Sequence, residues 1–395
     1  MFGFIANRLF GFITNRYFVL DRYTLGLFGK VLVLSFFCLA GLYIVIDFMS
    51  NFQEFNSYGK KVEGGLGTVV ADYYLARVYW FFDLTGGVIA MMAGIFAVTW
   101  MQRSNELTAV AAAGISPARM VRPLILAAVG VAALGVVNRE LLLPRVREKL
   151  ARNAQDWMGE SAKTCRPMWD LQTNILISGK TTMANEKRIE SPTFSQLPAK
   201  LSSWGRQITA ANAYFQPPRD GRPGGYLLRG IRQPANFARL KSASLEDVPV
   251  LLSPLDTPWL KPDECFVTSG VTFEQLTVGS SWQEYLSSWE LITGLHNKSL
   301  DYGSHVRVTL HARFVRPFLD VTLLFLGLPL VLTMGNRNIF MAGLLCLMVV
   351  AAFFGVTMMS HSLGTNYLLS PTLAAWLPLL IFGPTAYAIS RPMWE

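Results

Sequence analysis

Residues 31–49 read VLVLSFFCLAGLYIVIDFM, an apolar run whose one charged residue, Asp47, lies near its far end. A helix that crosses the hydrocarbon core of a bilayer needs about 20 consecutive, mostly apolar residues. Five more runs meet this requirement: Val78–Met101, Pro123–Leu143, Pro317–Met334, Ile339–Ser360 and Leu368–Ala388. The sequence therefore predicts an α-helical membrane protein with six transmembrane helices, three before and three after a long polar segment.

The composition supports a membrane location. The chain has 395 residues, of which 52% are apolar and 15% charged, whereas soluble domains carry about 25% charged residues. The net charge is +9, but many basic residues stand just beyond the apolar runs, where lipid headgroups lie. They form no single patch of the kind that binds nucleic acid. We therefore expect a membrane protein and no nucleic-acid partner.

Basic residues in the short connecting segments indicate the orientation, because Lys and Arg are enriched in cytoplasmic loops. With the N-terminus inside, the cytoplasmic segments carry Arg8, Arg16, Arg22, Lys30, Arg103, Arg119, Arg122, Arg337 and Arg391. The outer loop near 50–72 holds Lys60 and Lys61, and the loop near 362–370 holds none. Both termini are predicted to be cytoplasmic. Residues 1–30 are predicted to form a basic amphipathic segment on the membrane surface rather than a cleaved signal peptide.

Residues 144–304 separate the helical regions 31–143 and 305–395 and are predicted to lie outside. They contain short alternating stretches typical of strands: NILISG, QITAANAYF, GYLLRGI, VPVLLS and CFVTSGVTF. QPPRDGRPGG is typical of a hairpin turn. We expect a mainly β domain of sandwich or jelly-roll type, with a helix near Trp282–Leu295 leading back to the membrane. In an oxidising compartment Cys165 and Cys265 could form a disulfide, or they could be two unrelated thiols.

The sequence offers no catalytic or metal site. Residues 178–182 read SGKTT, but a phosphate-binding loop requires glycine at position 174, where this chain has Asn174. The four histidines lack the spacing of a zinc enzyme. We therefore predict no enzyme activity, no metal and no directly bound cofactor.

The segment Gln102–Ser116 reads QRSNELTAVAAAGIS. It resembles the cytoplasmic E-L-x-A-x-x-A-x-G-I-S segment of the LptF/LptG permease family of lipopolysaccharide exporters. Three further stretches match that family in order: Leu20–Tyr23 before the first span, His311–Arg313 at the fourth, and Pro371–Pro378 at the sixth. The resemblance extends from about residue 20 to the end, and the extension before it is longer than the family usually has.

The resemblance implies a permease subunit of an ABC transporter in the bacterial inner membrane. Such a subunit extracts lipopolysaccharide from the outer leaflet and passes it to a periplasmic β-jelly-roll bridge protein. The implied partners are a second related permease subunit and a cytoplasmic ATPase dimer, which uses the ATP. Residues 103–116 would be the coupling helix, with Glu106, Leu107, Ala113 and Gly114 in contact with the ATPase. The alternative is a tight turn that packs on a neighbouring helix.

Six arginines cluster near the outer ends of spans three and four, where basic residues should be scarce. They are Arg139, Arg145, Arg147, Arg307, Arg313 and Arg316. Arginine donates two hydrogen bonds to one phosphate, so we expect some of them to bind lipopolysaccharide phosphates. Alternatively they pair with Glu140, Glu148 or Asp320, or contact ordinary anionic lipid. Asp83 and Asp320 lie within spans and should face the bundle interior, and Asp320 could pair with Arg316 at i,i+4.

Three other functions remain as alternatives. A secondary transporter should have broken helices and coupling-ion residues near mid-membrane, for which Asp83 and Asp320 give only thin support. A membrane-anchored receptor for a periplasmic partner needs only one or two spans. A permease of the macrolide-exporter type would have four spans, with the insert after the first. The number and order of the spans favour the exporter.

Overall fold

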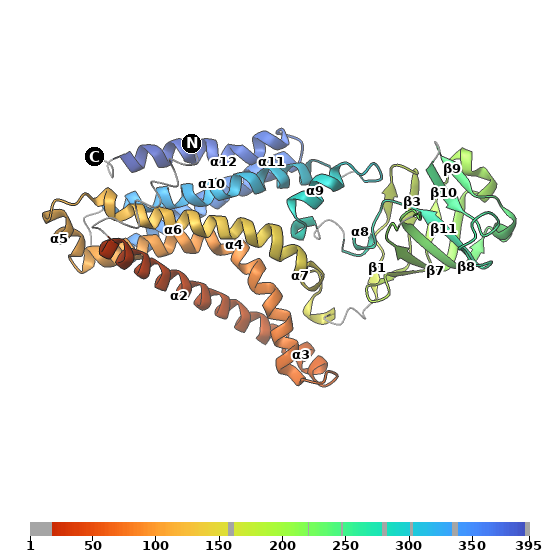
Figure 1. The fold of residues 1–395 in the computed structure, drawn as a ribbon, viewed down its shortest axis with the longest axis horizontal. Helices are drawn as coiled ribbons and strands as arrows, with labels where there is room; N and C mark the ends of the chain where they lie inside the picture. The colour runs from red at the N-terminus through yellow and green to blue at the C-terminus, as the bar shows by residue number, and fades with distance from the viewer. Residues whose placement is uncertain are drawn as a thin grey trace. The chain divides into compact units, whose positions relative to one another are not determined.

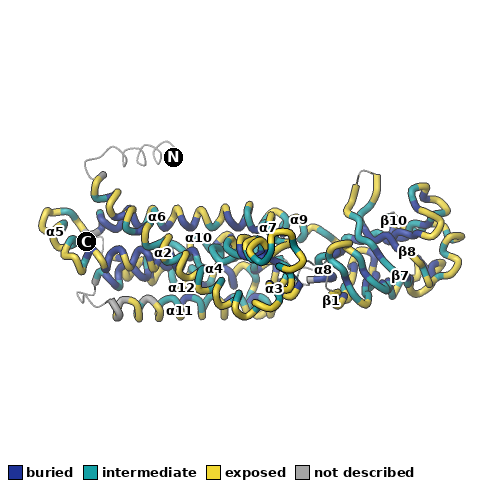
Figure 2. Tube along the Cα trace, turned by 90° about the horizontal axis from the view of Figure 1, so that it is seen from below, coloured by how far each residue is buried: buried dark blue, intermediate teal, exposed yellow. Residues whose placement is uncertain are grey.

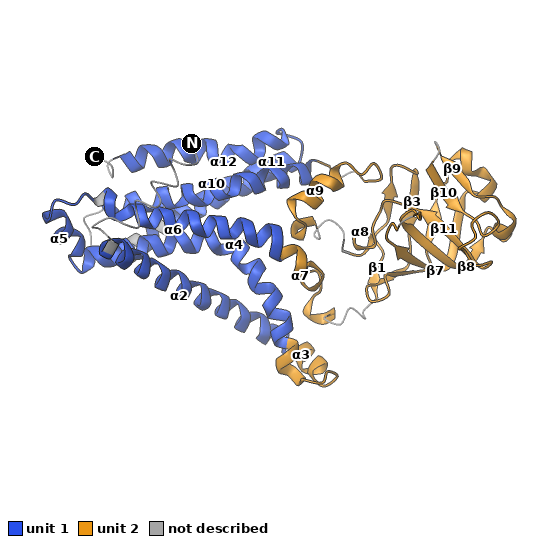
Figure 3. Ribbon diagram, in the orientation of Figure 1, with its two compact units in different colours: residues 1–52, 70–142, 304–395 blue, residues 53–69, 143–303 orange. Residues whose placement is uncertain are grey.

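The computed structural model describes residues 18–156, 162–219, 221–245, 248–278, 283–300, 303–333 and 339–391 (Figure 1). The chain divides into two compact units (Figure 3). Unit 1, the membrane unit, comprises residues 1–52, 70–142 and 304–395, and unit 2 comprises residues 53–69 and 143–303.

Among the described residues, six helices are long and apolar enough to cross a membrane, as predicted. They contain α2 (Phe18–Ser50), α4 (Gly65–Arg103), α6 (Pro117–Val137), α10 (Gly303–Thr333), α11 (Ile339–Thr365) and α12 (Pro371–Ser390). The third span continues beyond α6 through a π-helical turn, η1 (Asn138–Leu142), into α7 (Leu143–Leu150). Three spans precede the β region and three follow it.

The first two helices begin earlier than the apolar runs indicate. Helix α2 starts at Phe18, so residues 18–30 are helical and continuous with the first apolar run; residues 1–17 lie outside the described part. Residues 18–30 contain no proline that would interrupt a helix. Phe28 in this stretch is buried, so packing also supports the helical conformation. Helix α4 starts at Gly65, and the preceding loop contains α3 (Phe52–Gly59).

The membrane unit is built around α4 and α10. Half of the residues in the most apolar 18-residue stretch of each helix are buried, against 6% for α2 and 12% for α11. Figure 2 shows exposed residues recurring along α11. Buried Met91 and Ala97 of α4 share one core with Leu324 and Leu328 of α10. Small residues permit this close approach: a Cβ on Gly94 would stand 2.8 Å from the Leu324 side chain.

The β part of unit 2 is one 11-stranded antiparallel sheet. Its strands are β1 (Lys163–Thr164), β2 (Met168–Asp170), β3 (Ile175–Ser178), β4 (Thr181–Met183), β5 (Arg188–Glu190), β6 (Thr193–Ser195), β7 (Gln207–Gln216), β8 (Gly225–Gln233), β9 (Ala243–Leu245), β10 (Val248–Leu252) and β11 (Glu264–Thr268). The main order is β1-β4-β5-β7-β8-β11-β10-β9, and β2, β3 and β6 join it through β7. This confirms a mainly β insert between the third and fourth spans; its jelly-roll class stays a prediction.

The predicted hairpin is present, because β7 pairs with β8 across residues 217–224. The core of the sheet contains fully buried Trp204, Phe194 and Tyr226. The Tyr226 hydroxyl donates to the Val271 carbonyl at 2.9 Å, which satisfies the one polar group that this ring carries into the core.

Two short helices follow the strands, α8 (Phe273–Val278) and α9 (Ser288–Leu295). The helix predicted near Trp282–Leu295 is thus present in its second half, and Trp282 lies outside the described residues. Helix α9 begins where it does because Ser287 caps it: its hydroxyl accepts from the Glu290 backbone N–H, and the Glu290 carboxylate accepts from the Ser287 N–H.

The possible disulfide between Cys165 and Cys265 is absent, because both are free, buried thiols in the same core. Cys265 lies in β11 and Cys165 directly follows β1, and four strands separate β1 from β11 in the sheet order. Burial raises the pKa of the Cys165 thiol to about 11 and that of Cys265 to about 12. Both thiols therefore behave as inert core groups.

Candidate functional site

A short helix, α5 (Glu106–Ala112), connects the second and third spans. Asn105 before it has φ +60° and Gly114 after it has φ +77°, a left-handed conformation that asparagine and glycine tolerate best. None of the seven helix residues is buried, and residues 111–114 are all exposed. The small side chains here therefore form an uncovered surface that a partner could approach closely.

Two polar contacts join the start of the first span to this segment. The Tyr23 hydroxyl donates to Glu106 Oε1 at 3.0 Å, and Arg119 Nη2 lies 2.8 Å from Asp21 Oδ2. Asp21 is buried, whereas Glu106 is half-buried. Glu106 opens α5 and Arg119 lies in the first turn of α6, so α2 is connected to both ends of the loop.

A charge cluster lies inside the membrane unit, where α4, η1 and α10 meet. Arg139 Nη2 is 2.7 Å from Asp83 Oδ1, and Arg316 Nη1 is 3.5 Å from Asp83 Oδ2. Arg316 also donates to the Asp83 backbone carbonyl. The side chains of Arg139 and Asp83 are 9% and 14% exposed. Asp83 thus holds two arginines at once, in a setting where an unpaired charge would be costly.

Asp320 packs against the same place from α10. A Cβ built on Gly87 would come 2.2 Å from Asp320 Oδ1, so only glycine leaves room for this carboxylate beside α4. Asp320 and Gly87 line one small pocket together with Asp83, Arg139 and Arg316. The cluster therefore combines two acidic and two basic groups from three helical segments.

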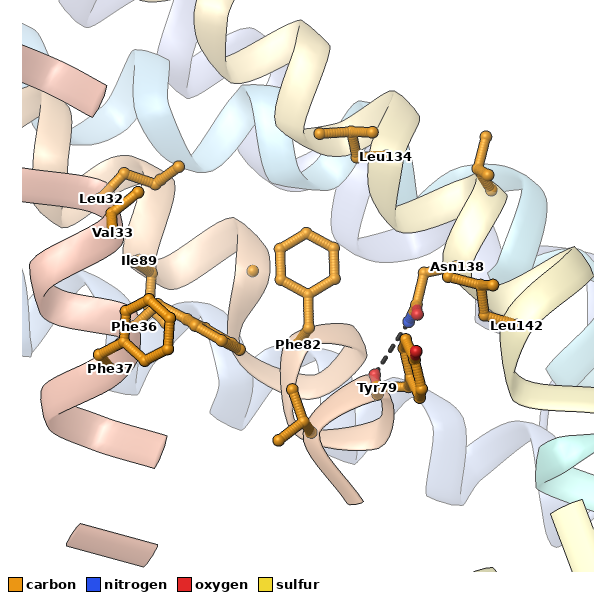
Figure 4. Close-up of a pocket in the computed structure, with 13 residues that line it drawn as sticks. Leu32, Val33, Phe36, Phe37, Tyr79, Phe82, Ile89, Leu134, Asn138 and Leu142 are labelled. Carbon is orange, nitrogen blue, oxygen red and sulfur yellow. Dashed lines mark hydrogen bonds between the residues drawn. The ribbon is translucent and has the colours of Figure 1, made fainter. Parts of the chain in front are cut away.

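An apolar cavity of about 400 Å³ lies beside the cluster (Figure 4). Its lining comes from α2, α4, α6 and η1 and consists of Leu32, Val33, Phe36, Phe37, Val78, Tyr79, Phe82, Gly86, Ile89, Leu134, Val137, Asn138 and Leu142. The Asn138 amide is held by the chain itself, because it donates to the Tyr79 carbonyl at 2.9 Å. The cavity therefore presents an almost wholly apolar wall.

Phe82 and Gly86 line both the apolar cavity and the charged pocket. The two spaces are therefore adjacent. One wall of the cavity is α2, whose most apolar 18-residue stretch is only 6% buried within the chain. This wall therefore leaves most of its own apolar surface uncovered within the chain.

The family model described as Lipopolysaccharide export system permease LptF/LptG matches residues 22–391. The chain belongs to the LptF/LptG family. Comparison with curated proteins gives no match. The family match and the six apolar helices make the chain a multi-pass inner-membrane permease component of the lipopolysaccharide export system.

In this LptF/LptG chain, the four predicted coupling residues lie together. Glu106 and Leu107 open α5 and are half-buried, and Ala113 and Gly114 follow it and are exposed. A Cβ on Gly114 would meet nothing within 4 Å, so the glycine serves the backbone conformation and not close packing. Sequence reasoning matched Leu20–Tyr23 to the family but did not predict the contact of Tyr23 with Glu106; two polar residues at the start of an apolar helix, Asp21 and Tyr23, were a signal that this end has partners.

The six arginines predicted to bind phosphate do not share one environment. Arg139 and Arg316 pair with Asp83, an acidic partner that the alternative of local ion pairs did not name; phosphate binding by these two residues stays a prediction. The pairing has a geometric reason, because α4 and α10 pack closely enough to bring Asp83 between the two guanidinium groups. Arg313 is buried in α10.

The other three arginines lie elsewhere. Arg145 and Arg307 are exposed, and Arg147 Nη1 lies 2.6 Å from Glu290 Oε1. Partial burial opposes ionisation of Glu290, but the Ser287 backbone N–H and the Arg147 charge outweigh it and lower the Glu290 pKa. Arg147 is therefore engaged in a contact within unit 2 that the LptF/LptG resemblance did not indicate.

Proposed function

We propose that this chain is one permease subunit of an ABC transporter that extracts lipopolysaccharide from the outer leaflet of the inner membrane and passes it to a periplasmic bridge. The apolar cavity beside the charge cluster carries this proposal. An acyl chain fits a wall of leucine, valine and phenylalanine side chains, because transfer of its CH₂ groups from water contributes about 0.8 kcal/mol each. Both termini would then be cytoplasmic and the β domain periplasmic.

The partners follow from the same proposal. A cytoplasmic ATPase dimer would dock on residues 103–116 and supply the energy of ATP hydrolysis, since this chain would bind no cofactor itself. A second related permease subunit would complete the cavity, which is supported by the largely uncovered apolar surfaces of α2 and α11. A β-jelly-roll bridge protein would continue the antiparallel sheet by strand addition.

Motion would pass from the ATPase to the cavity through α2. The Tyr23–Glu106 hydrogen bond and the Asp21–Arg119 ion pair join the coupling loop to this helix, and Val33 and Phe37, further along it, line the cavity. A rigid helix transmits a displacement of one end to the other. Arg145 of unit 2 and Arg307 of the membrane unit, each exposed in the structure, are separate candidates to bind lipid phosphates.

A crosslinking experiment tests the cavity. A photoreactive amino acid at Phe37, which is 68% exposed and lines the cavity, is compared with the same group at Leu380 on α12, which is 58% exposed. We expect lipopolysaccharide adducts at Phe37 in native membranes and only phospholipid adducts at Leu380. Equal adducts at both positions would contradict the proposed cavity.

Purification from native membranes tests the partners. The tagged chain should carry an ATPase subunit, a sister permease and bound lipopolysaccharide, identified by mass spectrometry. Replacement of Glu106 by Ala should reduce the ATPase and leave the sister permease. Recovery of the chain alone with bulk phospholipid would overturn the exporter proposal.

A further inference from the structure

Helix α9 displays a tryptophan on its outer side. Trp289 is 75% exposed, whereas Leu291 on the same helix is 1% exposed. Residues two apart on an α-helix point about 200° away from each other, so Leu291 faces the protein and Trp289 faces away from it. An indole exposed to this degree would leave a large apolar area in water if nothing covered it.

The helix that carries Trp289 is capped and contacts α7. The capping box of Ser287 and Glu290 fixes its first turn, and the Glu290 carboxylate is 2.6 Å from Arg147 Nη1. Trp289 is the immediate neighbour of Glu290. It therefore lies beside the residue that joins α9 to α7.

The contact to α7 indicates the depth of α9 relative to the membrane. Helix α7 continues the third span without interruption through η1. Arg147 lies four residues beyond Leu143, the end of the apolar run in the sequence, which is about 6 Å along a helix axis. The headgroup layer on each side of the hydrocarbon core is about 5–7 Å thick. Residue 303, where the fourth span begins, follows the end of α9 by only eight residues. From these chain distances we expect α9 at headgroup level.

The other exposed residues on this face are polar, and Ile292 at i+3 is half-buried. Thr293 and His296, at i+4 and i+7 from Trp289, are exposed and share its side of the helix. A single indole among polar side chains matches the membrane–water interface, where tryptophan is enriched because its ring is apolar and its N–H polar. A protein groove that receives a helix would instead require several apolar side chains along this face.

We propose that α9 lies in the membrane interface and that Trp289 inserts into the headgroup region of the bilayer, where it anchors the junction between the β domain and the third and fourth spans. This inference rests on the membrane location of the spans and not on lipopolysaccharide transport. Its failure would leave the proposed function intact.

Spin-label accessibility tests the anchor. A nitroxide is placed at W289C in a chain with Cys38 and Cys346 replaced by Ser, while buried Cys165 and Cys265 remain. The matched control is W169C in β2, where Trp169 is 39% exposed. The full chain, with its copurified partners, is reconstituted in phospholipid nanodiscs, and collisions with oxygen and with a water-soluble nickel complex are compared.

We expect the ratio of oxygen to nickel collisions to be several-fold higher at position 289 than at position 169. A nickel-dominated signal at 289 would place the residue in water, and low collision rates with both reagents would place it against protein; either result overturns the proposal.

A second measurement avoids the label. Phospholipids brominated near the headgroup should quench less of the tryptophan emission in W289F than in the unsubstituted chain, with no such loss in W169F. Equal quenching in W289F and the unsubstituted chain would also overturn the proposal.

Discussion

The membrane unit contains two polar arrangements that differ in their position in the bundle and in how many basic groups share one carboxylate. At the loop end, Tyr23–Glu106 and Asp21–Arg119 join α2 to residues on either side of the exposed α5. Inside the bundle, Asp83 pairs with both Arg139 and Arg316. A half-buried contact such as Tyr23–Glu106 can exchange partners at little cost, whereas removal of one member of a buried pair leaves an uncompensated charge. The Tyr23–Glu106 contact therefore suits signalling, and the two pairs of Asp83 suit a permanent join of three helical segments.

The largest effect is expected from Asp83→Ala. Both arginines would lose their carboxylate, and breaking a buried pair in this way costs about 3–5 kcal/mol. The helical signal of the detergent-solubilised chain, followed by circular dichroism on heating, should be lost at a clearly lower temperature. Glu63→Ala, at an exposed loop position, serves as the control and should melt like the unsubstituted chain. The same melting temperature for both variants would show that the cluster does not hold the bundle together.

Gly87→Ala tests the close approach beside the cluster. The added Cβ would clash with Asp320, and overpacking of this kind costs about 1–3 kcal/mol. Gly86→Ala is the matched control, because its Cβ would meet Phe82 at an ordinary 3.5 Å and alanine favours helix. Thermal melts should place Gly87→Ala below, and Gly86→Ala at or above, the unsubstituted chain. The reverse order would refute the packing argument.

Tyr23→Phe tests the signalling role of the loop-end arrangement. Loss of one hydrogen bond should lower stability by only about 0.5–1.5 kcal/mol, so folding and ATPase association should persist. We expect less lipopolysaccharide transported per ATP hydrolysed in the reconstituted complex. Tyr387→Phe, at an exposed position on α12, should leave this ratio unchanged. An unchanged ratio in Tyr23→Phe would remove Tyr23 from the coupling route.

The smallest effect is expected at Arg147–Glu290, an ion pair whose side chains are 40% and 38% exposed and which contributes about 0–1 kcal/mol. The pKa of Glu290 is lowered in the folded chain, so its contribution is present above the ordinary value of 4.5 and is lost as pH falls through the folded value. Hydrogen exchange of α9 amides, corrected for intrinsic rates, should show protection falling below that pH. Glu290→Gln should have lower protection at neutral pH and less pH dependence; an identical profile would show that the charge contributes nothing.

Sequence reasoning was strongest where a property repeats along the chain. Runs of apolar residues located the six spans, alternation located strands such as β7 and β8, and the 102–116 motif located α5. It was weakest for partners that lie far apart in the chain. The arginines were recognised as unusual, but Asp83 is 56 residues from Arg139 and 233 from Arg316, and no local pattern connects them.

The sequence alone determined the class of the protein, the order of its spans, the β insert and the position of the 102–116 segment, because each depends on local hydrophobicity, propensity or a short motif. Only the tertiary structure decided that Asp83 pairs with both arginines, that Tyr23 reaches Glu106, that the two cysteines stay unbonded and that α2, α4, α6 and η1 line one cavity. These features depend on how helices and strands rotate and pack against one another, and small differences in that packing decide which side chains meet.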